Sequence, residues 1–161
     1  MAGYNGLVTE LMPAGNNGAL IANRYRILDA LGEGAMGLVW KVLDTATLQE
    51  SALKVIAAKY RVAEKSLLQF KQEFQMMTQL RHPNCCAVYD YGVMEDGDPY
   101  FTMEVVDGAG LNELAPLRPE QFVPVMTQLL LALGYIHQLG LVHLDVKSEN
   151  VRVMPDGVVK L

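Results

Sequence analysis

Short runs of apolar residues, separated by turn-forming residues, dominate the chain between residues 23 and 106. Runs of about four to eight residues, rich in branched and aromatic side chains, are typical of β-strands. Five such runs occur, at Tyr25–Leu31, Leu38–Leu43, Ser51–Ile56, Cys86–Val93 and Tyr100–Val106. We therefore predict five short antiparallel strands, the last two joined by a hairpin turn at Glu95–Asp98.

Two other stretches have the period of a helix. From Glu64 to Leu80, apolar residues recur at steps of three and four. This helix should end at Arg81–Pro83, because the residue before a proline is disfavoured in helical geometry. A longer helix is expected over Pro119–Leu139, with Gly140 as its C-terminal cap. Its apolar face is predicted at Val123, Met126, Leu130, Leu133 and Ile136.

This order of elements predicts an α+β fold with a five-stranded antiparallel sheet, one helix, a hinge and the start of a helical lobe. Residues 1–22 contain many turn-forming residues and little to bury, so we expect a flexible leader. Residues 23–106 would form the first lobe. Residues 107–161, which begin with the linker Asp107–Gly110, would form the hinge and part of the second lobe.

Composition narrows the class of protein. About half of the 161 residues are apolar, which is enough for a core. The 13 Lys and Arg residues against 18 Asp and Glu argue against binding to nucleic acid or an anionic membrane. No apolar stretch suits a membrane span or a signal peptide. The neighbouring Cys85 and Cys86 fit two small buried side chains in a reduced compartment, so we expect a cytoplasmic protein.

Three glycines, Gly32, Gly34 and Gly37, lie between the first two predicted strands. On its own this spacing is equally compatible with a plain hairpin. A strand on both sides argues against a dinucleotide-binding fold, in which a strand leads into a helix. Without Cβ atoms, such a hairpin can bring backbone N–H groups close to phosphate oxygens.

Lys54 lies in an otherwise apolar predicted strand, and Glu73 lies on the apolar face of the following helix. A strand lysine commonly extends to solvent along its own stem. An inward carboxylate, however, requires a cation. We therefore predict an ion pair between Lys54 and Glu73.

The segment Leu141–Asn150 places Asp145, Lys147 and Asn150 at close intervals. These residues suit a base, a cation and a metal ligand around one transferred phosphoryl group. Ten residues alone would be weak evidence. The glycines, Lys54 and Glu73 upstream supply the other parts expected for this chemistry.

In this order the motifs resemble those of the eukaryotic-type Ser/Thr protein kinases, including their bacterial members. The resemblance extends from about Arg24 to Leu161, and Val158–Leu161 is similar to the strand before the family's Asp-Phe-Gly metal motif. It implies the N-terminal part of a catalytic domain that transfers the γ-phosphoryl group of ATP, with Mg²⁺, to a Ser or Thr of a protein substrate. The lysine two residues after Asp145 resembles the Ser/Thr branch.

The resemblance also implies roles for individual residues. Asp145 would accept the proton of the substrate hydroxyl, Lys147 would neutralise phosphate charge, and Asn150 would hold Mg²⁺. His143 would be a packed structural residue. The implied ATP-binding residues are Leu31, Gly32, Gly34, Gly37, Val39, Ala52, Lys54, Glu73, Met103, Glu104 and Val106.

Three positions depart from the family pattern. Leu144 stands where an arginine usually precedes the aspartate, so control through a phosphorylated activation loop is in doubt. Ser148 replaces a proline, which is a milder change. Arg152 stands where the family offers an apolar side chain to adenine, so the affinity for nucleotide would be altered.

Two functions are compatible with these residues. In the first, the chain is part of an active Ser/Thr kinase. In the second, it is a non-catalytic kinase-like module that binds nucleotide or serves as a docking surface. We expect the 161-residue chain alone to be inactive, because the second metal carboxylate of the family is missing from it. We also expect the apolar surface of the helix at Pro119–Leu139 to remain exposed or to find a partner.

Overall fold

The computed structural model describes residues 20–34, 37–56, 74–75, 77–95 and 97–161. The chain divides into two compact units. Unit 1 comprises Met1–Leu68 and Asp90–Thr102, and unit 2 comprises Gln69–Tyr89 and Met103–Leu161. Each unit is considered by itself below.

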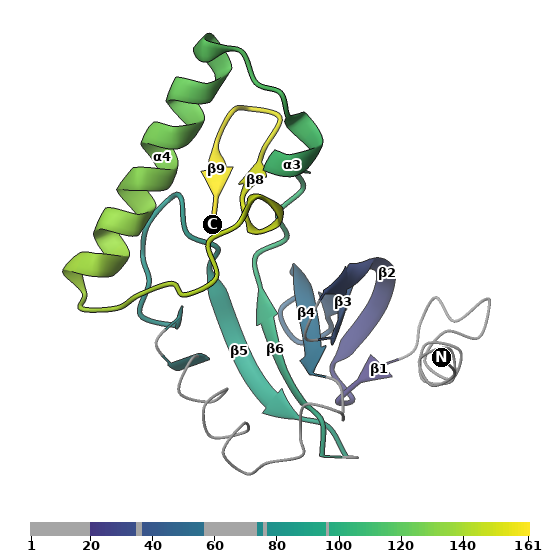
Figure 1. Ribbon diagram of the computed structural model, residues 1–161. Coiled ribbons are helices and arrows are strands. Elements are labelled where there is room, and N and C mark those ends of the chain that lie inside the picture. The colour runs from purple at the N-terminus through teal and green to yellow at the C-terminus, as the bar shows by residue number, and fades with distance from the viewer. Residues whose placement is uncertain (1–19, 35–36, 57–73, 76, 96) are drawn as a thin grey trace, which may run out of the picture. The chain divides into compact units, whose positions relative to one another are not determined.

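A six-stranded sheet contains the five predicted strands, which confirms the expected fold class. Its spatial order is β1-β2-β3-β4-β6-β5, and the first four strands pair antiparallel (Figure 1). The strands are β1 (Leu20–Ile21), β2 (Tyr25–Gly34), β3 (Gly37–Asp44), β4 (Glu50–Ile56), β5 (Val88–Val93) and β6 (Pro99–Met103). The fourth predicted strand therefore begins two residues later than expected, and the fifth ends three residues earlier.

Strand β1 corrects the boundary of the predicted leader. Leu20 and Ile21, which we assigned to a flexible segment, pair with β2, and Ile21 is buried. Ala22 and Asn23 adopt positive φ values of 50° and 54°, and the amide of Arg24 donates to the carbonyl of Ile21 at 3.1 Å. The abundance of glycine and asparagine before residue 19 concealed two apolar residues that can pair with a strand. Residues 1–19 lie outside the described residues.

One face of strands β2 to β4 forms the core of unit 1. The fully buried side chains there include Trp40, Tyr25, Val42 and Leu53. Strand β3 pairs Trp40 with Leu53 of β4, so alternate residues of both strands contribute to this face. The tight pairing of large side chains fixes the register, because a shift by one residue would expose all of them.

A cluster of charged side chains lies next to the core residue Tyr25 in unit 1. The guanidinium of Arg24 donates to both carboxylate oxygens of Asp44, at 2.9 and 2.7 Å, and to Asp90 at 2.6 Å. The hydroxyl of Tyr25 donates to the same oxygen of Asp90 at 3.1 Å. Arg24 holds the pKa of Asp44 below its ordinary range. Burial, followed by the charge of Asp90, raises the pKa of Tyr25. We call these four residues the Arg24 cluster.

Unit 2 combines a long helix with a small sheet of three short strands in the order β7-β8-β9. Helix α4 lies beside the β8–β9 hairpin in Figure 1. Its buried side chains Val125 and Leu129 pack against Val151 and Val159. The elements are β7 (Ala109–Gly110), α3 (Leu111–Leu114), α4 (Pro119–Gln138), a 3₁₀ turn (Ser148–Asn150), β8 (Arg152–Val153) and β9 (Val159–Lys160).

Helix α4 confirms the helix predicted at Pro119–Leu139. Proline suits its first turn, because the missing N–H would have no partner there. Gly140 follows the helix with φ of 74° and donates to the carbonyl of His137 at 2.9 Å. Leu141 donates to the carbonyl of Ile136 at 3.2 Å, which completes a Schellman cap.

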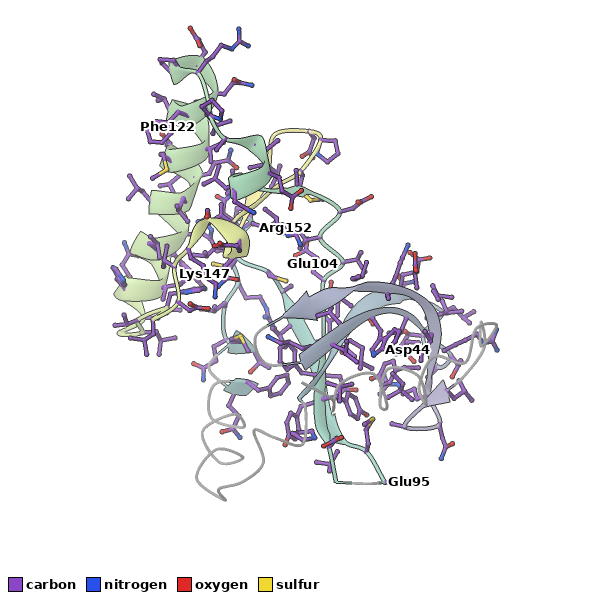
Figure 2. All side chains as sticks on the ribbon, turned by 45° about the vertical axis from the view of Figure 1, so that its right-hand side comes forward. Asp44, Glu95, Glu104, Phe122, Lys147 and Arg152 are labelled. Atoms are coloured by element: carbon purple, nitrogen blue, oxygen red, sulfur yellow. The ribbon has the colours of Figure 1, made fainter. Side chains whose placement is uncertain are left out.

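The apolar face predicted for this helix was partly wrong. Val123 and Leu130 are 60% and 62% exposed. The buried residues are Val125, Leu129, Ala132 and Ile136. Apolar residues occupy most of the helix circumference, so spacings of three and four fit more than one face. Other helix residues with large exposed apolar side chains are Phe122, which Figure 2 labels, and Leu131.

The helix predicted from Glu64 to Leu80 lies largely outside the described residues. Phe74, Gln75 and Met77 are helical, and the amide of Thr78 donates to Phe74 at 2.9 Å. In the described part of the chain, no helix is long and apolar enough to cross a membrane.

The segment Asn84–Cys86, which follows the helix predicted at Glu64–Leu80, is hydrogen-bonded to β9 and to Leu161 within unit 2. Leu161 donates to the carbonyl of Asn84 and accepts from the amide of Cys86, both at 2.9 Å. The buried amide of Asn84 also donates to the carbonyl of Val159 and to the side chain of Gln128 on α4, both at 2.8 Å. These bonds explain why the segment groups with the second unit.

Candidate active site

The glycine-rich segment forms the hairpin between β2 and β3, in which Gly34 lies opposite Gly37. Gly32 follows an irregularity in the register and has φ of 149°, a value that side chains with a Cβ rarely adopt. The space around a Cβ at Gly32 is open, so its backbone conformation is what requires glycine. Residues 35–36, at the end of the hairpin, lie outside the described residues.

Three predicted ATP-binding residues share one face of the neighbouring strands. Val39 lies directly opposite Lys54 in the β3–β4 pair, and Ala52 lies two residues before Lys54 on the same side of β4. The ammonium of Lys54 is 5.9 Å from the centre of the Phe101 ring. Glu73 lies outside the described residues, so its ion pair with Lys54 remains a prediction.

Three further predicted ATP-binding residues lie at and after the end of β6, shortly before the predicted hinge. Met103 is the last residue of this strand and is half-buried. Glu104 donates from its backbone amide to the carbonyl of Ala87 at 2.8 Å, and Val106 follows in an irregular segment. Leu31, another of the implied ATP-binding residues, is 45% exposed in unit 1.

Asp145, Lys147 and Asn150 are in direct contact. The ammonium of Lys147 lies 3.0 Å from Oδ2 of Asp145. The Nδ2 group of Asn150 donates to the same Oδ2 and to the backbone carbonyl of Asp145, both at 2.8 Å. We call these three residues the Asp145 cluster; Figure 2 labels Lys147 within it.

The short 3₁₀ turn and the residue after it hold the Asp145 cluster in place. The amide of Asn150 donates to the carbonyl of Lys147 at 3.0 Å, which closes the turn. Val151 is 1% exposed and packs with Val125 and Leu129 of α4. Its carbonyl accepts from Leu111 at 2.9 Å. The three side chains of the cluster therefore project from a segment whose next residue belongs to the core of unit 2.

The electrostatics of the cluster favour an ionised aspartate. Hydrogen bonds from Lys147 and then from Asn150 lower the pKa of Asp145. The backbone amide of Asp145 donates to Nδ1 of His143 at 3.3 Å. His143 therefore contacts the backbone of Asp145, and its electrostatic contribution to lowering the pKa of the carboxyl is smaller than those of Lys147 and Asn150.

The three departures from the family pattern have distinct surroundings. Leu144 has φ of 64° and is 90% exposed, so nothing in its unit covers it. Ser148 donates to Glu149 within the same turn at 3.2 Å. Arg152 donates to the carbonyl of Gly108 at 3.2 Å and lies 3.6 Å from the carboxylate of Glu113.

The side-chain oxygen atoms of Asp145 and Asn150 are of the kind that binds a hard cation such as Mg²⁺. Asn150 turns Nδ2 toward Asp145, so Oδ1, on the other side of the amide, is the atom available to a cation. Across the residues that the structure describes, no group of three or more His, Cys, Asp or Glu side chains could hold a metal ion. Asn150 and Asp145 alone would form an incomplete set of ligands.

Sequence reasoning did not predict the ion pair between Lys160 and Glu104. Lys160, on β9, lies 2.8 Å from Oε1 of Glu104. The only local signal is that Lys160 interrupts the apolar stretch Val158–Leu161, and this does not indicate which carboxylate it contacts.

Comparison with known proteins identifies relatives of this arrangement. The family model described as the protein kinase domain matches residues 25–161. Serine/threonine-protein kinase PknL of Mycobacterium tuberculosis is 36% identical over 148 residues, which cover 89% of this chain and 37% of PknL. PrkC of Bacillus subtilis is 33% identical over 148 residues, covering 89% of this chain and 23% of PrkC.

Comparison with solved structures also finds protein kinase domains. The kinase domain of M. tuberculosis PknI is 28% identical with a TM-score of 0.78, and the match covers 90% of this chain and 59% of that domain. The chain thus spans about a quarter to a third of the curated relatives and about three-fifths of the solved kinase domain. The matched family model covers most of the chain, which belongs to the protein kinase domain family.

Proposed function

We propose that this chain is the N-terminal part of an ATP-dependent Ser/Thr protein kinase domain. The observation that supports this most directly is the Asp145 cluster, in which a carboxylate contacts both a lysine and an asparagine. Phosphoryl transfer requires a base, positive charge and a metal ligand close together, and these three side chains supply them.

In the proposed reaction, the bond from the γ-phosphorus to the bridging oxygen of ATP breaks. A new bond forms between the phosphorus and a Ser or Thr oxygen of the protein substrate. The hydroxyl proton passes to the ionised carboxylate of Asp145, whose pKa is kept low by Lys147 and Asn150. Lys147 would move from Asp145 toward the γ-phosphate. Mg²⁺, held in part by Oδ1 of Asn150, would supply further positive charge to the phosphates.

Residues of each unit, taken separately, have a proposed role in binding ATP. In unit 1, the glycine hairpin and Leu31, Val39 and Ala52 would cover the nucleotide, and Lys54, held by Glu73, would contact the α- and β-phosphates. In unit 2, the backbone of Glu104 and Val106 would bind the adenine edge, and Met103 would lie behind it. The free thiols of Cys85 and Cys86 support a reducing compartment such as the cytoplasm.

A second candidate is a non-catalytic module that binds nucleotide weakly or docks a partner. The position of Arg152 supports it, because a guanidinium tied to Gly108 and Glu113 stands where kinases usually carry an apolar side chain. ATP binding alone is compatible with both candidates. Phosphoryl transfer that depends on Asp145 separates them.

ATP binding provides the first test. Titration of the 161-residue chain with ATP and Mg²⁺ in a calorimeter should give measurable binding. Lys54→Met and Glu73→Gln should each weaken it. The double variant should bind no more weakly than the worse single variant, because either change already breaks the ion pair. Binding that is unaffected by all three variants would contradict the proposed nucleotide site.

A further inference from the structure

The ion pair between Glu104 and Lys160 differs from the surface pairs of this protein. The ammonium of Lys160 lies 2.8 Å from both carboxylate oxygens of Glu104. The two side chains are only 14% and 25% exposed, for Lys160 and Glu104 respectively. A surface pair such as Lys41 with Glu50 is 32% and 53% exposed. Limited access to water strengthens the first pair.

Glu104 is attached twice to Ala87. Its backbone amide donates to the carbonyl of Ala87 at 2.8 Å, and its carboxylate accepts from the amide of Ala87 at 3.3 Å. The thiol of Cys86 lies 3.8 Å from the backbone carbonyl of Glu104. These contacts constrain both the main chain and the side chain of Glu104.

The other end of the ion pair is anchored as well. Lys160 belongs to β9, which pairs with β8. Leu161 exchanges backbone hydrogen bonds with Asn84 and Cys86. Glu104, the segment 84–87 and the end of β9 therefore form one closed set of contacts within unit 2. Figure 2 labels Glu104 just beyond strand β6.

Removing Lys160 would leave the carboxylate of Glu104 partly buried without its cation. A carboxylate in that position gains by turning into water. This rotation would break its bond to the amide of Ala87 and remove one of the two attachments of residue 104. The main chain at Glu104 would then sample more conformations.

We propose that Lys160 is a positioning residue for nucleotide binding. It holds the main chain of Glu104 in the conformation that binds the adenine edge. This inference rests on the proposed function, because it assumes that the backbone of Glu104 contacts a nucleotide. Lys160 itself need not touch the ligand. Its effect is exerted through the carboxylate of Glu104 and the contacts with Ala87.

Affinity for ATP in the 161-residue chain is the first measurement. If Lys160→Met reduces the competent conformer of Glu104 to between about a third and a tenth of the molecules, the dissociation constant rises about three- to tenfold. Glu104→Gln should have a similar effect, and the double variant should add little. Lys160→Arg, which retains the charge, should restore most of the affinity. Lys41→Met is the matched control and should change nothing.

Amide hydrogen exchange without nucleotide provides the second measurement. Lys160→Met should accelerate exchange at Glu104, whose amide is bound to Ala87, relative to amides of α4. If Lys160→Met left the protection of the Glu104 amide unchanged, the inference would be overturned, whether or not ATP binds. Unchanged or tighter ATP binding by Lys160→Met would overturn it as well. Failure of the unaltered chain to bind ATP would overturn the proposed function, while the exchange measurement would still report on the ion pair.

Discussion

The Arg24 cluster of unit 1 and the Asp145 cluster of unit 2 contain similar groups in different surroundings. Each contains an aspartate whose pKa is lowered, mainly by its hydrogen bond to a cationic side chain. The side chain of Asp44 is 9% exposed, whereas that of Asp145 is 59% exposed. Figure 2 labels Asp44 and Lys147, one member of each cluster.

This difference in burial distinguishes the structural role of Asp44 from the chemical role that we propose for Asp145. The carboxylate of Asp44 accepts two bonds from Arg24 and one from the amide of Ala46, at 2.9 Å. Such a group contributes to stability, because losing its partner would leave a buried charge. The carboxylate of Asp145 remains accessible to a substrate, and water screens its bond to Lys147. Its removal should affect reaction rate much more than folding.

The largest expected effect is that of Asp145→Asn on phosphoryl transfer. A chimaera would join residues 1–161 to the part of the PknI kinase domain beyond the match. Loss of the base should lower its rate of substrate phosphorylation about 10²- to 10⁴-fold. The melting temperature should change little, since Asp145 is exposed. Ser148→Ala, in the 3₁₀ turn that follows Asp145, is the control and should keep both properties. A variant that retained the rate would contradict the assigned base.

Arg24→Met should have the next largest effect, on stability. Removing the guanidinium leaves Asp44 buried without its cation, which should lower the free energy of unfolding by about 2–4 kcal/mol. The estimate is below that for a fully buried pair, because Arg24 is 38% exposed. Urea unfolding of the chain provides the measurement. Lys41→Met, which breaks a surface pair, should cost less than about 1 kcal/mol. Equal losses in the two variants would show that burial does not distinguish them.

The smallest expected effect is the loss of stability in acid that is due to Asp44. The folded pKa of Asp44 lies below the value of about 3.9 expected in the unfolded chain. The unfolded state therefore binds the proton more readily, and stability due to Asp44, complete above about pH 5, declines as pH falls toward the folded pKa. Urea unfolding between about pH 5 and pH 2 should show a decrease of about 1–2 kcal/mol from this group.

Two variants separate the contributions to this acid dependence. Asp44→Asn should flatten the decrease, since it removes the titrating group. Asp145→Asn should leave the curve nearly unchanged, because the partners of that exposed carboxylate are screened by water. If Asp145→Asn flattened the curve as much as Asp44→Asn, the contrast between the two clusters would be wrong.

The sequence alone was sufficient to locate five of the six strands of the sheet, though not β1, and the cap of α4. Alternation of apolar residues fixes which side of a strand is buried, and Gly140 can adopt the positive φ that ends the helix. It also selected Asp145, Lys147 and Asn150 as candidate site residues, and their close spacing in one segment allows the contacts that the structure shows; their roles stay predictions. These features depend on residues near one another in the chain.

Contacts between distant segments were decided only by the tertiary structure. Arg24 meets Asp90 across 66 positions, Glu104 meets Lys160 across 56, and the amide of Asn84 reaches Val159 across 75. The buried face of α4 likewise depends on where Val151 and Val159 pack, because its sequence is apolar on several sides. Local spacing determines backbone conformation through short-range sterics and hydrogen bonds. Which charges become buried together depends on how the whole chain packs, and no local pattern records that.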